Sequence, residues 1–477
     1  MDLVADLPVA TLPGAPPIPV VGRLPNILRF FRDPLGRLTD LHARYGDVAA
    51  LNRGDATWVA VRGAENLRKA LGDARGFHNL ADSPIPVPRG SAPDILFANA
   101  LTAINGDAHR RARRLMAPIF TKSAVAGYQP EIAATVERVV GTWRMGTADV
   151  SHLAMELALH VAMKSLYGID PGQEAAEIGR LSKAFLEGVL SMGVMLFPVA
   201  VPGSPYARWM NDCASYERLL RRLVAERRAR PDDRRDVLST LIRARDEDGS
   251  QLTEDDLVAH AAVLLTASHE TSANTIAWTL LLLAAHPRVY ADLADELSAE
   301  LRGAAPQVEQ LARLPLLDRV VKESQRLLPA SCILFFRAAQ EPFALGGYDL
   351  PAGTRLLTSP FIAHRDPGAY PAPGRFDPSR WERIEPSPYE YLPFGAGPRL
   401  CIGAQFAAQA VRIALAVILS RFRFEMIPGA RVDRAVRGIT LGAKDGIPMR
   451  LVAPGGSFAA PAPLRGDLHA IVDGLPS

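Results

Sequence analysis

The sequence has few cysteines and no secretion signal, and its least charged stretch is interrupted by prolines. Its three cysteines, Cys213, Cys332 and Cys401, are too few and too far apart for a disulfide framework or a CxxC zinc site, which indicates a reducing compartment. The N-terminus is acidic and contains an early proline, where a signal peptide would have a basic region and an apolar run. The least charged stretch, residues 188–207, contains three prolines and argues against a transmembrane anchor. We therefore expect a cytoplasmic protein without an anchor.

The chain also lacks a strong charge of either sign. Its 54 basic residues nearly balance its 51 acidic residues, which leaves a net charge of +3. This balance provides no global attraction towards a nucleic acid, and no nucleic-acid partner is predicted. Because 48% of the 477 residues are hydrophobic, the chain can bury a large core.

Helical periodicity dominates the sequence. Apolar residues recur at helical spacing over 34–45, 65–72, 107–120, 128–145, 150–167, 174–192, 206–229, 254–301 and 404–421. Short alternating segments near residues 48–63 and 332–361 predict a small sheet, whereas 80–106 and the Pro-rich segment 366–393 show no period. We predict a mainly α fold with a subordinate β-sheet, organised as a Pro-rich strap (1–27), one domain (28–455) and a tail (456–477).

One cysteine, Cys401, lies between a Gly-rich loop and the start of a strongly apolar helix. Free N–H groups and the helix dipole at such a position favour a thiolate, with a lowered pKa, that binds a metal. Phe394 would cover the sulfur, and Arg399 would bind a carboxylate close to it. Three glycines permit a tight turn or close approach to a flat ligand; they are Gly395, Gly397 and Gly403. The alternative is a buried structural cysteine.

Two charged pairs stand at helical spacing. Glu323 and Arg326 are three residues apart and would pair, although an exposed pair of this kind contributes little stability. His109 and Arg113 share one side of a short basic helix. The remaining cations of that helix would form a solvated face, a nucleic-acid surface or a docking surface for an acidic electron donor; they are Arg110, Arg111 and Arg114.

An acid and a hydroxyl, Glu270 and Thr271, occupy the middle of an otherwise apolar helix. Burying either side chain without a partner costs free energy, so the pair requires a partner or a function. Two structural explanations stay open: Thr271 would bond back to the carbonyl of Ala267, and Glu270 would pair with a distant arginine.

The pattern Phe394-x-x-Gly397-x-Arg399-x-Cys401-x-Gly403 resembles the haem-binding loop of the cytochrome P450 family, and the other motifs follow in the family's order. This resemblance implies the cytochrome P450 fold, haem b as cofactor and Cys401 as the thiolate ligand of its iron. It also implies that Arg380 bridges Glu323 and Arg326 in a structural triad.

The resemblance further assigns roles around the haem. Glu270 and Thr271 would deliver protons during dioxygen reduction, and Ala267 would be the small residue facing the haem. The remaining cofactor-binding residues that it implies are His109, Arg113, Arg337, Phe394, Gly395, Arg399 and Gly403. Of these, His109, Arg113, Arg337 and Arg399 would hold the haem propionates.

By the same resemblance the protein is expected to be a monomeric haem-thiolate monooxygenase. It would insert one oxygen atom from O2 into a lipophilic small molecule such as a terpenoid, fatty acid, steroid or polyketide. Electrons would come from a separate ferredoxin or flavodoxin and its NAD(P)H reductase. The expected pocket residues are Met192, Met195, Phe197, Ile333 and Leu334. Rearrangement or desaturation without net oxygen insertion, and a haem-based ligand sensor, stay open as alternatives; Cys213 receives no role.

Overall fold

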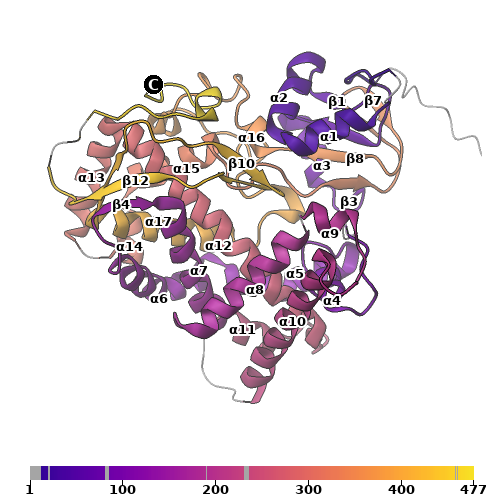
Figure 1. Ribbon diagram of the computed structural model, residues 1–477, viewed down its shortest axis with the longest axis horizontal. Coiled ribbons are helices and arrows are strands. Elements are labelled where there is room, and N and C mark those ends of the chain that lie inside the picture. The colour runs from indigo at the N-terminus through magenta and orange to yellow at the C-terminus, as the bar shows by residue number, and fades with distance from the viewer. Residues whose placement is uncertain are drawn as a thin grey trace, which may run out of the picture.

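The computed structural model describes residues 12–19, 22–80, 85–189, 191–229, 236–303, 305–456, 458 and 460–476. These residues form a mainly helical structure with small sheets, which confirms the predicted fold class (Figure 1). The α-helices are α1 (Leu24–Arg32), α2 (Pro34–Tyr45), α3 (Ala64–Gly72), α4 (Ala92–Ala98), α5 (Gly106–Met116), α6 (Lys122–Val140), α7 (Val150–Tyr167), α8 (Gln173–Val189), α9 (Met192–Leu196), α10 (Pro205–Ala229), α11 (Val237–Arg243), α12 (Glu254–Ala285), α13 (Pro287–Leu301), α14 (Val308–Leu311), α15 (Pro315–Leu327), α16 (Pro360–Ala363) and α17 (Ala404–Arg421). Short 3₁₀ helices are η2 (Ala117–Phe120), η3 (Pro378–Glu382), η4 (Gly397–Arg399) and η5 (Asp467–Ala470).

The largest sheet lies beside α1–α3, at the upper right of Figure 1, and the helical part fills the rest of the view. The strands are β1 (Val48–Ala50), β2 (Trp58–Val61), β3 (Phe77–Asn79), β4 (Gly146–Asp149), β5 (Arg337–Ala339), β6 (Phe343–Leu345), β7 (Tyr348–Leu350), β8 (Arg355–Thr358), β9 (Arg423–Met426), β10 (Arg434–Arg437), β11 (Thr440–Ala443) and β12 (Pro448–Val452). The largest sheet has the order β1-β2-β8-β5-β3, with β2 and β8 parallel and the other pairs antiparallel. The other sheets are β4-β12-β9, β10-β11 and β6-β7.

The long helix α12 runs through the middle of the helical part (Figure 1) and packs most extensively against α7. It begins with a capping box, in which Thr253 and Asp256 each accept a hydrogen bond from the other's backbone N–H, at 3.1 and 3.0 Å. The acidic residues in its first turn stabilise the helix, because their negative charges lie at the positive end of the helix dipole. Its second half is buried on all sides, so α12 is a rigid support for side chains along its length.

Helix α17 follows the cysteine loop directly and lies in the same core. It is long and apolar enough to cross a membrane, but 56% of it is buried within the protein, which is typical of a core helix. Its start at Ala404 and its end at Arg421 agree with the prediction.

Three predictions about local structure were wrong. The extended strap ends before residue 27, because α1 begins at Leu24 with a proline in its first turn, where proline favours helix initiation. Residues 80–106 contain the short helix α4, which also starts at a proline. The strand expected from residue 332 begins only at Arg337.

The tail beyond residue 456 is packed: Leu464 and Leu468 are buried, and the Asp473 N–H donates to the Gly374 carbonyl at 2.8 Å.

Candidate functional site

The cysteine loop is closed by its own backbone. The N–H of Cys401 donates to the carbonyl of Phe394 at 2.9 Å, and the N–H of Leu400 donates to Gly397 through the turn η4. Gly397 has a φ of 69°, and a Cβ there would collide with the Leu71 carbonyl of α3. Gly397 therefore serves the contact between the loop and α3.

The other two glycines of the loop, Gly395 and Gly403, differ in backbone conformation and in surroundings. Gly395 turns the chain with a φ of 72° and lies beside Leu334, whose Cδ2 would be 3.7 Å from an added Cβ. Gly403 has an ordinary φ of −88°, and nothing lies within 4 Å of the position of its missing Cβ. The backbone at Gly403 is thus open on the side where a flat ligand would lie.

The thiol of Cys401 does not have the lowered pKa that the helix start predicts. Cys401 is exposed by surface area, yet protein atoms crowd its sulfur, and this burial raises the pKa of the thiol. The Gly403 N–H and the charge of Arg113 act in the opposite direction and are outweighed. The prediction considered the helix terminus alone, and desolvation is the larger effect.

Four basic side chains, three arginines and one histidine, lie close together beside this loop. His109 and Arg113 come from α5, Arg337 from β5 and Arg399 from η4. Burial, together with the charges of the neighbouring arginines, lowers the pKa of His109 to about 4. Burial also lowers the pKa of Arg337 and of Arg399 to about 10, each with a second contribution from a neighbouring arginine. The three charged arginines therefore repel one another electrostatically, and His109 beside them is neutral at pH 7.

This cluster has no acidic partner within the described residues. None of its three arginines forms an ion pair there, although Arg337 is only 5% exposed. Nη1 of Arg337 and Nε of Arg399 are buried without a hydrogen-bond partner in the described part of the chain. A buried guanidinium nitrogen without an acceptor is costly unless an anion binds to it. The cluster fits the two carboxylates of a haem.

Asn105, which the sequence analysis missed, fixes the position of Arg399. The guanidinium of Arg399 donates to Oδ1 of Asn105 at 2.5 Å and to the carbonyls of Ile104 and Leu101 at 2.8 and 3.2 Å. Asn105 in turn bonds to the backbone of Asn79 in β3. Asn105 is 26 positions from Asn79 and almost 300 positions from Arg399, so no local sequence pattern predicts these contacts.

Replacing Arg337 with methionine is expected to stabilise the chain without haem and to weaken its hold on haem. Removing one of the mutually repelling buried cations should stabilise the haem-free chain by about 1–4 kcal/mol, measured by denaturant unfolding. The same change removes a carboxylate-binding group, so haem should transfer faster to a competing apoprotein. Arg450→Met, at an exposed position of β12, is the control and should change neither value. A haem-loss rate unchanged by Arg337→Met would contradict the assignment.

The predicted ionic triad is formed and buried. Glu323 and Arg326, both 0% exposed, make two bonds of 2.9 Å within α15, and Nε of Arg380 donates to the same carboxylate at 3.0 Å. Nε1 of Trp381 and the N–H of Asp377 complete the partners of Glu323 at 3.1 and 2.9 Å. The carboxylate is therefore fully hydrogen-bonded, as a buried charge requires.

The two arginines of the triad hold the loop that precedes the cysteine. Arg326 donates to the carbonyls of His364, Pro373 and Arg375 at 2.7–3.1 Å. Arg380 donates to the carbonyls of Pro371, Ala372 and Arg375 at 2.7–3.3 Å. The triad thus joins α15 to the otherwise irregular segment 366–376.

His364, also missed by the sequence analysis, extends this connection to the cysteine loop. Its ring is 0% exposed; Nδ1 lies 3.2 Å from the Arg326 carbonyl, and Nε2 accepts the N–H of Leu392 at 2.9 Å. Burial lowers the pKa of His364 to about 3, so the ring is neutral at pH 7 with its proton on Nδ1. His364 therefore bridges α15 and the residues just before Phe394.

In α12, Ala267 and Thr271 lie one turn apart. Ala267 is exposed whereas most residues of the adjacent turns are half-buried, as expected of a residue that faces a ligand site. Oγ1 of Thr271 donates to the Ala267 carbonyl at 2.8 Å, as one structural explanation predicted. The Thr271 hydroxyl group thus uses its only proton in this bond, and its oxygen can still accept a hydrogen bond.

Among the described residues, no arginine pairs with Glu270. Its Oε1 lies 3.0 Å from the hydroxyl of Thr440 in β11, a residue that the sequence analysis did not consider. The structure thus places Glu270 towards the β10–β11 hairpin.

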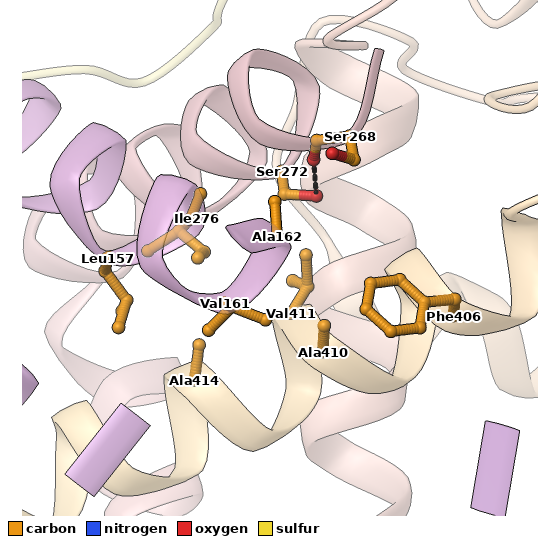
Figure 2. Close-up of a pocket in the computed structure, with 11 residues that line it drawn as sticks. Leu157, Val161, Ala162, Ser268, Ser272, Ile276, Phe406, Ala410, Val411 and Ala414 are labelled. Atoms are coloured by element: carbon orange, nitrogen blue, oxygen red, sulfur yellow. Dashed lines mark hydrogen bonds between the residues drawn. The ribbon is translucent and has the colours of Figure 1, made fainter. Parts of the chain in front are cut away.

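A small cavity of about 20 Å³ lies on another face of α12, between α7 and α17 (Figure 2). Ser268 and Ser272 line it, and the Ser272 hydroxyl donates to the Ser268 carbonyl at 2.8 Å. Its other walls are apolar side chains such as Val161, Phe406 and Val411. The cavity has room for about one water molecule and none for an organic substrate.

The five expected pocket residues differ in burial. Met195 and Phe197 are 38% and 69% exposed, so they do not form part of a closed roof. Ile333 is 2% exposed, and Leu334 is half-buried against the cysteine loop at Gly395. The side chain of Met192 lies outside the described residues.

The basic surface expected on α5 is largely neutralised. Arg111 and Arg114 both pair with Asp246, at 3.2 and 2.7 Å, and Arg110 pairs with Asp107. Asp246 lies in the loop before α12, more than 130 residues away in sequence. Arg111 and Arg114 attach α5 to that loop and Arg110 is paired within α5, so none of the three is free to form the predicted docking surface.

The exposed cysteine beside a carboxylate-binding cluster defines a haem-thiolate site. The model of the cytochrome P450 family matches residues 12–446, and the chain belongs to this family. Cyclooctatin synthase of Streptomyces melanosporofaciens is 32% identical over 91% of this chain and 94% of the relative. Pentalenene oxygenase of Streptomyces avermitilis is 31% identical over 88% of this chain and 92% of the relative.

Solved structures agree on the fold. Retinoic acid-bound cyanobacterial CYP120A1 has a TM-score of 0.79 at 22% identity, over 94% of this chain and all of that chain. The haem domain of cytochrome P450DA has a TM-score of 0.81 at 24% identity, over 93% of this chain and 98% of that chain. The protein is a haem-thiolate monooxygenase.

Proposed function

We propose that this monooxygenase oxygenates a terpenoid. The observation that carries the proposal is the set of relatives at 31–32% identity over 88–91% of the chain. Their names are cyclooctatin synthase, cyclooctat-9-en-7-ol 5-monooxygenase and pentalenene oxygenase. The uncharged character of residues 188–207 is compatible with an apolar substrate of this kind.

The cofactor in this proposal is haem b, which supplies oxygen activation when bound. Cys401 would hold its iron, and Phe394, Gly395 and Gly403 would border it. His109 is neutral at pH 7 and would donate one N–H to a propionate, beside the charged groups of the three arginines. The triad and His364 would keep the cysteine loop in place.

Thr271 and Glu270 would share proton delivery. Because the Thr271 proton is used for the Ala267 carbonyl, its oxygen would accept a hydrogen bond from water or a bound ligand and orient it. Glu270, its neighbour in the chain, would supply the carboxyl group that passes on the proton. Electrons would come from a separate ferredoxin or flavodoxin with its NAD(P)H reductase, and the protein would act in the cytoplasm.

A ligand panel tests the substrate class. Purified holoprotein is titrated with pentalenene, cyclooctat-9-en-7-ol, a long-chain fatty acid and a steroid, and the shift of the Soret band is recorded. We expect a saturable shift with a terpenoid, and one isotopic oxygen atom in its product when turnover uses labelled dioxygen. Binding and turnover of the fatty acid or the steroid alone would contradict the proposal. A terpenoid product without label would instead indicate rearrangement or desaturation.

A further inference from the structure

Glu270 belongs to a face of α12 that lies along β11. One turn later, Asn274 contacts Gly442, where a Cβ would approach the Asn274 side chain at 3.1 Å. One turn further, Nε1 of Trp278 donates to the Leu441 carbonyl at 3.1 Å. Glu270 meets Thr440 at the start of the same strand, at 3.0 Å. The contact with Thr440 is therefore part of a continuous interface between α12 and β11.

Thr440 is held firmly in that interface. It is 9% exposed and forms an isolated bridge with Ser331, in the segment that follows α15. On either side of it, the Ile439 carbonyl accepts the N–H of Cys332 at 3.0 Å, and the N–H of Leu441 donates to Ala330 at 2.8 Å. The position of the Thr440 hydroxyl is thus set by backbone contacts and is independent of Glu270.

The hydroxyl of Thr440 has one proton and two neighbouring acceptors. Oε1 of Glu270 is 3.0 Å away, and the carbonyl of Arg437 is 2.9 Å away. If Glu270 is ionised, the hydroxyl donates to the carboxylate. If Glu270 is protonated, its O–H donates to Oγ1 of Thr440, and the hydroxyl turns to the Arg437 carbonyl. Both arrangements keep the carboxyl group in one place.

A cation at this position would serve only the ionised form of Glu270. Within the described residues no cation forms an ion pair with Glu270, and the guanidinium of Arg437 donates instead to the Lys444 carbonyl at 3.0 Å. A neutral hydroxyl with a second acceptor can form a hydrogen bond with the carboxyl group in either protonation state, which a cation cannot do. That property suits a carboxyl group that must release and regain a proton.

We propose that Thr440 is a positioning residue that holds the carboxyl group of Glu270 in both of its protonation states, by reversing one hydrogen bond. This inference rests on the proposed role of Glu270 in proton delivery. The one covalent bond that changes is the O–H bond of Glu270: it breaks when the carboxyl group passes its proton to a water molecule, and it forms again when a proton returns from solvent.

The test uses the holoprotein with a surrogate ferredoxin and its NADPH-dependent reductase, with and without pentalenene. Two quantities are measured in H2O and in D2O: the rate of oxygen consumption and the share of oxygen released as hydrogen peroxide. The variants are Thr440→Val, Thr440→Ser, Glu270→Gln and the double variant Thr440→Val/Glu270→Gln. The Soret band of the reduced carbon monoxide complex verifies that each variant retains its haem site.

Thr440→Val should change the rate or the peroxide share about tenfold in the direction of Glu270→Gln, since one hydrogen bond of ordinary strength is lost. It should also change the solvent isotope effect in that direction. Thr440→Ser should resemble the unchanged protein, because it keeps the hydroxyl. The double variant should equal Glu270→Gln alone, because Thr440 acts only through that carboxyl group.

Two outcomes would overturn the inference and are distinguishable. If Glu270→Gln has an effect and Thr440→Val has none, or if their effects add, Thr440 does not act through Glu270. If Glu270→Gln itself has no effect, the proposed role of Glu270 in proton delivery fails, and the inference fails with it.

Discussion

Replacing Glu323 with glutamine is expected to destabilise the protein severely, by about 3–5 kcal/mol. The amide cannot neutralise Arg326 and Arg380, which are 0% and 4% exposed, and it replaces an acceptor oxygen with a donor that faces them. A loss of this size is a large part of the total stability of an ordinary domain, about 5–15 kcal/mol. Denaturant unfolding and the fraction of haem-loaded protein after purification measure the effect.

A matched change in an exposed pair provides the control. Glu382 pairs with Arg319 at 2.8 Å, and its side chain is 53% exposed. Glu382→Gln should cost at most about 1 kcal/mol, because water solvates both charges when the pair is broken. Equal losses for the two glutamine variants would contradict the view that burial makes the triad important.

A milder variant covers the case in which Glu323→Gln does not fold. Trp381→Phe removes only the 3.1 Å bond from Nε1 to Glu323 and keeps most of the ring contacts. It should cost about 1 kcal/mol and leave a folded protein. Its haem should be lost faster, since the triad holds the segment that leads to the cysteine loop. Haem loss at the unchanged rate would argue against that connection.

The pair of Glu323 and Arg326 could be predicted because the two residues stand at i and i+3, whereas Arg380 was assigned to the triad by the family resemblance. Helix α7 was predicted at residues 150–167 from its apolar periodicity, and the structure shows that Asp149 caps its start and that Gly168, at a φ of 64°, ends it. Signals of this kind lie within a few residues of the element that they define.

The predictions that were wrong or missing depend on contacts between distant segments. Asp246, in the loop before α12, neutralises Arg111 and Arg114. No sequence pattern near α5 predicts this partner. Likewise, only the folded chain shows that Thr440 is the partner of Glu270. The short helices α1 and α4 were missed because fewer than three turns give a weak periodic signal.

Replacing Cys401 with serine is expected to abolish the red-shifted Soret band of the reduced carbon monoxide complex, together with oxygenase activity. Serine keeps the size of the side chain and the backbone bond to Phe394, so the loop should remain closed. It removes the thiolate, whose electron donation to the iron produces both the shifted band and the capacity to cleave dioxygen. The carbon monoxide difference spectrum is the direct measurement.

The other two cysteines show why this expectation is specific to Cys401. Cys213 and Cys332 are 0% exposed, and burial raises the pKa of the Cys332 thiol to about 12 and that of Cys213 further still. Neither presents its sulfur to a ligand, and Sγ of Cys332 is bound to the Ile439 carbonyl at 3.4 Å. Cys213→Ser is therefore the control: it should cost about 1–3 kcal/mol by burying a hydroxyl and leave the spectrum unchanged. A shifted band that survives in Cys401→Ser would remove the iron ligand from this loop, and the cationic cluster beside it would then need another explanation.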